Sequence, residues 1–136
     1  MSDDQELQDL LIDEDFGEVD DQKEVCRETQ MISEIKKIVK DQRKDDEGIP
    51  VEGTYPYLRV YFKFAEGPFA GRMLSCIFSF HPDMKWMLKQ LITACGLPEA
   101  RPDFRDAIGK RVHHHLGVEK YDGQDRNVIK APFNAA

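Results

Sequence analysis

The stretch that decides the fold is YLRVYFKFAEGPFAGRMLSCIFSF, residues 57–80. Residues 57–64 alternate in the way of a strand with one buried face. The apolar side chains are Leu58, Val60, Phe62 and Phe64, and the opposite face carries Tyr57, Arg59, Tyr61 and Lys63. The glycines and proline of residues 66–71 predict a turn, and residues 72–80 predict a second strand. The stretch therefore predicts an antiparallel hairpin with one face on a core.

A helix is predicted after this hairpin. Pro82 and Asp83 suit its first turn, and Gly96 ends it. Its predicted buried stripe consists of Met84, Met87, Leu88, Leu91, Ala94 and Cys95. Residues 102–109 then predict a short helical turn that stops at Gly109.

A second hairpin is predicted at the end of the chain. Residues 110–121 alternate between apolar and polar side chains, and residues 126–130 form a returning run. Between them, Asp122-Gly123 is a strong signal for a two-residue hairpin turn.

This order of elements predicts a mainly β (α+β) fold, a five-stranded OB-like barrel with one helix between strands 3 and 4. The missing strand has to come from residues 29–40. Apolar residues at 31, 32, 35, 38 and 39 fit helical spacing better than alternation, but a barrel edge needs closing, so we predict a strand there. The predicted organisation is a disordered acidic tail over residues 1–24 and an OB-like domain over residues 25–136.

Charge separates the tail from the domain. Residues 1–22 carry ten acidic and no basic side chains, while the rest of the chain sums to +3. Such dense like charge predicts disorder. Apolar residues within it make a candidate partner-binding segment, with a solubilising tail as the alternative: Leu10, Leu11, Ile12 and Phe16.

Cysteine usage and hydropathy indicate a cytoplasmic protein. The three cysteines are far apart and form no C-x-x-C motif, which favours free thiols in a reducing compartment. No apolar run approaches the roughly 20 residues that span a bilayer, and the N-terminus lacks a signal-peptide pattern.

Several stretches of the chain resemble a family of small bacteriophage proteins. They are a G-P-F-x-G-R turn at 67–72, an L-x-x-L…G-L helix at 88–97, an I-G-K step at 108–110 and a G-x-x-R-N-x-I-K strand at 123–130. That family is encoded near phage replication and recombination genes and is taken to bind single-stranded DNA. The resemblance covers about residues 55–132, and it implies a single-stranded-DNA-binding protein acting in a bacterial host cell.

The polar face of strand 57–64 supports the same expectation. A single-strand binder needs rings on which bases stack and cations that meet phosphates. Tyr57, Arg59, Tyr61 and Lys63 interleave the two, although a solvated strand face carries the same residue types. Secondary phosphate-binding candidates are Arg72, Lys110, Arg111, Lys120, Arg126 and Lys130. Phe69, at a turn tip, stacks a base or plugs the barrel end.

The three consecutive histidines and Trp86 are the remaining aromatic candidates. Strand alternation predicts that His114 packs inward, while His113 and His115 face outward beside Arg111 as DNA-contacting residues. Trp86 falls on the lysine-bearing side of the predicted helix. It is a second contact surface, a partner or dimer anchor, or a rim residue covered by a loop, and we favour the last.

The sequence offers little for metal binding or catalysis. A strand brings together two of the three consecutive histidines, whereas a metal site needs at least three ligands. No nucleophile elbow, phosphate loop or zinc-protease motif occurs. We therefore expect no cofactor and no enzymatic activity.

The resulting functional hypothesis is a non-sequence-specific single-stranded-DNA-binding protein of phage replication or recombination. The acidic tail would compete with DNA for the binding surface and recruit phage or host replication and recombination proteins. A homodimer stays open. The alternative is a protein-interaction or DNA-mimic regulator that acts through the acidic N-terminal segment.

Overall fold

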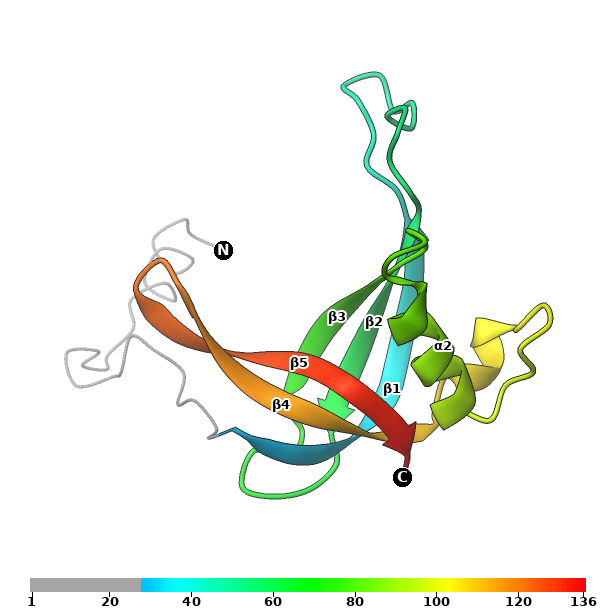
Figure 1. The fold of residues 1–136 in the computed structure, drawn as a ribbon. Coiled ribbons are helices and arrows are strands. Elements are labelled where there is room, and N and C mark those ends of the chain that lie inside the picture. Colours follow the sequence, from blue (N-terminus) through cyan, green and yellow to red (C-terminus); the bar gives the residue numbers. More distant parts are fainter. Residues whose placement is uncertain (1–27) are drawn as a thin grey trace, which may run out of the picture.

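The computed structural model describes residues 28–136, so the predicted tail and its apolar residues Leu10, Leu11, Ile12 and Phe16 lie outside the described residues. The elements follow in the order β1 (Thr29–Asp41), β2 (Tyr57–Phe64), β3 (Met73–Ser79), α2 (Lys85–Ala94), the 3-10 turn η1 (Phe104–Ala107), β4 (Arg111–Tyr121) and β5 (Gln124–Ala135). All strand pairs are antiparallel, in the order β3-β2-β1-β4-β5 (Figure 1).

Strand β1 holds the two halves of the sheet together. Its first half pairs with β4 and its second half pairs with β2, and the chain bends between them (Figure 1). A β-bulge between Ile35 and Lys37 shifts the alternation by one residue. Met31, Ser33 and Ile35 therefore point to the core before the bulge, and Ile38 does so after it. The bulge explains why a strand has helix-like apolar spacing, and the predicted strand is confirmed.

The expected closed barrel is wrong, because the five strands form one open sheet. No backbone pairing joins the edge strands β3 and β5 in residues 28–136. Helix α2 lies along the C-terminal half of β5, where the Phe133 N–H donates to Gln90 Oε1 at 3.0 Å. That N–H is therefore unavailable to β3. Farther along, the Cys76 thiol points to the Ile129 carbonyl at 3.8 Å, so a side chain spans the gap.

The core lies on one side of this curved sheet. Its largest fully buried side chains are Phe62, Phe64, Phe78, Ile35, Leu91, Leu116 and His114. Helix α2 adds Leu88, Leu91, Ile92 and Ala94. The predicted stripe was wrong at Met84, which is exposed, because the helix begins one turn later than the sequence suggests: Pro82 and Asp83 lie in the preceding turn.

The C-terminal hairpin has the predicted turn. Asp122 and Gly123 have φ angles of 52° and 77°, the two positive values of a type I′ turn. The returning strand is longer than residues 126–130 and reaches Ala135. Two segments project from the sheet in different directions, this hairpin and the arm formed by residues 42–56 (Figure 1). Within residues 28–136 no helix has the length and apolar character to cross a membrane.

Candidate nucleic-acid interface

The face of the sheet opposite the core, here called the outward face, carries the four leading candidates. Tyr57, Arg59, Tyr61 and Lys63 alternate with the buried residues of β2, as predicted. On the neighbouring strand β1, Lys37 is the Cα partner of Tyr61, and its Nζ lies 5.6 Å from the centre of the tyrosine ring. Across β3, Arg59 Nη1 donates to Ser75 Oγ at 3.4 Å. Side chains of the neighbouring strands thus contact Tyr61 and Arg59 of β2.

Two apolar side chains of β3 extend this surface. Met73 is the Cα partner of Lys63, and Ile77 is the partner of Arg59. Both are nearly half exposed. We call the resulting set the outward patch, and it consists of Lys37, Tyr57, Arg59, Tyr61, Lys63, Met73 and Ile77. A surface that mixes cations, rings and aliphatic side chains suits a ligand with both charged and flat apolar parts.

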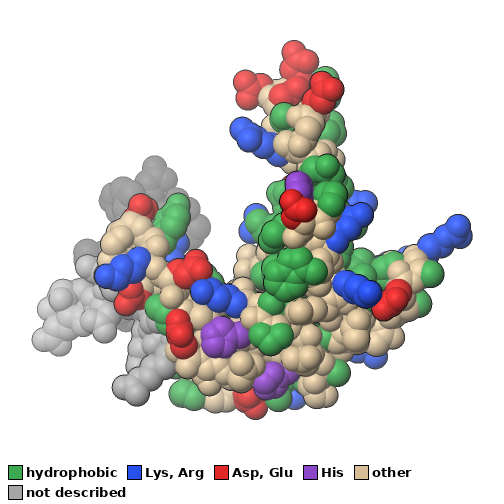
Figure 2. Space-filling model, viewed as in Figure 1, with side chains coloured by type: hydrophobic (Ala, Val, Ile, Leu, Met, Phe, Trp, Pro, Cys, Tyr) green, Lys and Arg blue, Asp and Glu red, His purple; other side chains and the backbone are tan. Residues whose placement is uncertain are grey.

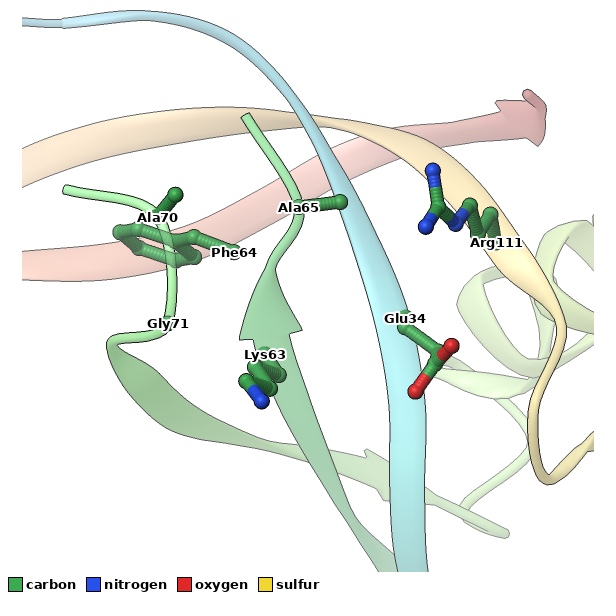
Figure 3. A pocket seen from close by; sticks show the side chains of 7 residues that line it. All are labelled: Glu34, Lys63, Phe64, Ala65, Ala70, Gly71 and Arg111. Carbon is green, nitrogen blue, oxygen red and sulfur yellow. The ribbon is translucent and has the colours of Figure 1, made fainter. Parts of the chain in front are cut away.

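The outward patch continues onto β4 through one acidic residue. Glu34 of β1 is the Cα partner of Lys63 on one side and of Arg111 on the other. These three side chains line a shallow hollow of about 370 Å³ beside the β2–β3 turn, with Glu34 between the two cations (Figure 3). Lys36 Nζ binds Glu34 Oε2 at 2.7 Å. This contact, then the charges of Arg111 and Lys63, lowers the pKa of the Glu34 carboxyl.

The three histidines of β4 divide as predicted. His114 is fully buried, while His113 and His115 are partly exposed on the outward face. His115 Nδ1 accepts from Gln30 Nε2 at 3.4 Å. Within residues 28–136 no three His, Cys, Asp or Glu side chains gather in a way that could hold a metal ion.

The remaining candidates separate into two groups. Arg126 and Lys130 share the outward face of β5, where Lys130 Nζ pairs with Glu119 Oε1 at 3.1 Å and Arg126 stacks 4.7 Å above the Tyr121 ring. Phe69, Arg72 and Lys120 lie on the core side or its rim. Lys110, in the turn before β4, is exposed.

Phe69 and Arg72 engage each other. The Phe69 ring packs over the small cluster of Met31, Phe64 and Leu116, at the end of the sheet. The Arg72 guanidinium lies 4.4 Å from the centre of that ring, and its Nη1 donates to Asn127 Oδ1 at 3.5 Å. The structure therefore does not bring this pair together with the tyrosines of β2.

Sequence reasoning missed Lys37, Met73 and Ile77. The bulge in β1 hid the face on which Lys37 lies. Met73 and Ile77 carried a usable signal, because they alternate with the core residues of the strand at 72–80. The expectation that a loop covers Trp86 was wrong: its side chain is 50% exposed.

Charge on the projecting arm has the opposite sign. Acidic side chains gather at its tip, which stands away from the sheet (Figure 2), and they are Asp45, Asp46, Glu47 and Glu52. Asp45 Oδ1 accepts the backbone N–H groups of Glu47 and Ile49, which shapes the turn.

No protein-family model matches this chain, and a search of curated proteins found no match. The functional proposal therefore rests on the chemistry of the outward face.

Proposed function

We propose that this protein binds single-stranded DNA without sequence specificity, through the outward patch. The observation that carries the proposal is the alternation of rings and cations along β2, with Tyr61 between Lys37 of β1 and the Arg59–Ser75 contact to β3. Stacking on tyrosine tolerates every base, because every base has a flat face, and Lys and Arg attract the phosphates between stacked bases. The protein needs no catalytic group for this role.

The strand order supports an OB-like interpretation of the sheet. Strand β1 pairs with both β2 and β4, and the helix lies between β3 and β4, as in that fold. OB-folds bind oligonucleotides on the face of strands 2 and 3, which here is the outward patch. Together with the resemblance to small phage proteins, this favours a role in phage DNA replication or recombination in a bacterial host.

The acidic arm determines toward which side of the sheet the bound DNA runs. Its tip carries four carboxylates, which repel phosphates. The cations outside the arm continue instead from Lys63 past Glu34 to Arg111 and the outward histidines of β4. The proposed path of the DNA therefore crosses β2 and β1 toward β4 and leaves the arm free.

The proposal is tested by titrating the full chain into fluorescein-labelled oligo-dT at 50 mM salt and recording anisotropy. Binding is expected to weaken with salt, with a log–log slope of about −0.7 for each phosphate contacted. Tyr61→Ala is expected to weaken binding by roughly 5- to 150-fold, since a stacked base is worth about 1–3 kcal/mol.

Tyr55→Ala is the matched control, because Tyr55 is 45% exposed but packs edge-on against His81, outside the outward patch. It is expected to leave the affinity unchanged. Absence of binding at 50 mM salt would refute the proposal and favour a regulator that acts through its acidic segment. Equal losses of affinity in the Tyr61→Ala and Tyr55→Ala variants would show that DNA does not bind at the outward patch.

A further inference from the structure

Helix α2 has an apolar groove on the side that does not face the sheet. The groove has a volume of about 480 Å³, and it lies between the helix and the segment that follows it. Phe80, Ile92 and Phe104 contribute to its apolar lining, together with the half-exposed indole of Trp86. Lys85 and Lys89 stand at its rim. An exposed tryptophan beside apolar walls is typical of a binding surface for another peptide or protein.

The charge and the apolar lining of the groove favour an acidic peptide with large apolar side chains as its ligand. Two exposed lysines flank the groove, and the acidic Glu99 pairs only loosely with Lys89, at 4.0 Å. Two cations are few for a nucleic acid, whose affinity grows with the number of phosphates that are neutralised. The apolar lining, in contrast, matches leucine, isoleucine and phenylalanine side chains.

The chain itself contains such a peptide. Residues 7–16, LQDLLIDEDF, combine Leu10, Leu11, Ile12 and Phe16 with carboxylates and no basic residue. Residues 17–28, which join this segment to β1, can reach up to about 40 Å, roughly three times the radius of gyration of about 13 Å expected for a domain of 100 residues. Covalent linkage also gives the segment a millimolar effective concentration, on the order set by a short linker.

We propose that the groove of α2 binds residues 7–16 of this chain, with the apolar side chains against Trp86 and Phe104 and the carboxylates near Lys85 and Lys89. The acidic segment is then held on a surface separate from the outward patch. This inference does not depend on DNA binding, and it explains why a tryptophan lies half exposed between two lysines.

Trp86 is the only tryptophan of the chain, so its fluorescence reports on the groove alone. The experiment measures acrylamide quenching of the full chain and of the Leu11→Ser/Phe16→Ser variant, both at 50 mM salt. We expect a quenching constant about twofold higher in the variant, because the bound segment would cover the half-exposed indole of Trp86. Ile49→Ser, an exposed apolar residue of the arm, is the matched control and is expected to match the wild type.

A second variant tests the charge complementarity. In a Lys85→Glu/Lys89→Glu background, the Leu11→Ser/Phe16→Ser changes are expected to alter quenching no further, because the segment has already left the groove. Equal quenching constants in the wild type and the Leu11→Ser/Phe16→Ser variant would overturn the proposal. Equal quenching constants in these two proteins, with protection of Trp86 in both on adding oligo-dT, would assign the groove to nucleic acid instead.

Discussion

Three consecutive histidines on β4 occupy two environments, and the difference follows from strand alternation alone. His114 is fully buried, whereas His113 and His115 lie on the outward face with Arg111. The same side chain therefore contributes to the core at one position and to the exposed face of the sheet one residue away. The face of the sheet decides the role of an ionisable residue here.

The surroundings of the buried histidine favour its neutral form. Its Nδ1 donates to the His115 carbonyl at 3.0 Å, so Nε2 is left to accept from the Ser33 hydroxyl at 2.7 Å. The rings of Phe62, Phe64 and Phe133 surround it, with centroids 5.5 to 6.5 Å away. Burial lowers the pKa of His114, and the charges of His113 and His115 lower it further, against the opposing effect of the hydrogen bond to the His115 carbonyl.

Replacing the inner histidine is expected to have the largest effect on stability. His114→Ala leaves a cavity among the phenylalanines and a buried Ser33 hydroxyl without its partner, at a cost of about 3 kcal/mol. His113→Ala, its outward neighbour, is expected to cost less than about 0.5 kcal/mol. Urea unfolding monitored by circular dichroism measures both, and similar losses would contradict the difference between the two faces.

The contribution of the buried His114 to stability is expected to depend on pH. The folded-state pKa of His114 is lower than its unfolded value, near 6.5, so between the two values the unfolded chain binds more protons. The stabilisation provided by the neutral ring of His114 is therefore fully present above about pH 6.5, and it is lost as the pH falls toward the folded-state pKa.

Unfolding free energies of the wild type from pH 7.5 to pH 5 measure this loss. The Ser33→Ala/His114→Phe variant replaces both partners by apolar groups and is expected to lose less stability over that range. An unchanged pH slope in the variant would mean that other groups cause the effect. The lowered pKa values of Glu34 and Asp103 do not interfere, because these carboxyls titrate at more acidic pH.

Gly117 tests the outward face with a substitution of small expected effect. It lies on the outward face of β4, where an added Cβ would come within 2.9 Å of Lys130 Cε. This neighbour is the flexible end of a side chain, which can move at the expense of its exposed ion pair with Glu119. Gly117→Ala is expected to change the free energy of unfolding by less than about 1 kcal/mol, as measured by urea unfolding. A loss as large as that of His114→Ala would show that the outward face tolerates no such movement.

Elements with a strong local signal could be predicted from the sequence. Strict alternation gave the bounds of β2 correctly, and Asp122-Gly123 gave the hairpin turn. The two faces of β4 follow from the same alternation, so the positions of the three histidines were predicted correctly.

The features that were missed depend on distant contacts. The bulge in β1 lies just after the residues that pair with β4, within the part that pairs with β2, and it hid Lys37. At the open edge of the sheet, Gln90 of α2 accepts the backbone N–H of Phe133, 43 residues away in sequence. The exposure of Trp86 depends on where the segment after α2 runs. No local pattern encodes these three results.

The central claim is that the outward face binds single-stranded DNA while the core face only holds the fold. Methyl labelling of isoleucine and methionine tests it most directly, because β1 and β3 supply matched pairs. Met73 and Ile77 are exposed on the outward face, whereas Met31 and Ile35 are buried in the core. On adding oligo-dT, we expect the methyl signals of Met73 and Ile77 to shift and those of Met31 and Ile35 to stay in place. Shifts confined to Met84, Met87 and Ile92 of the α2 region would contradict the account.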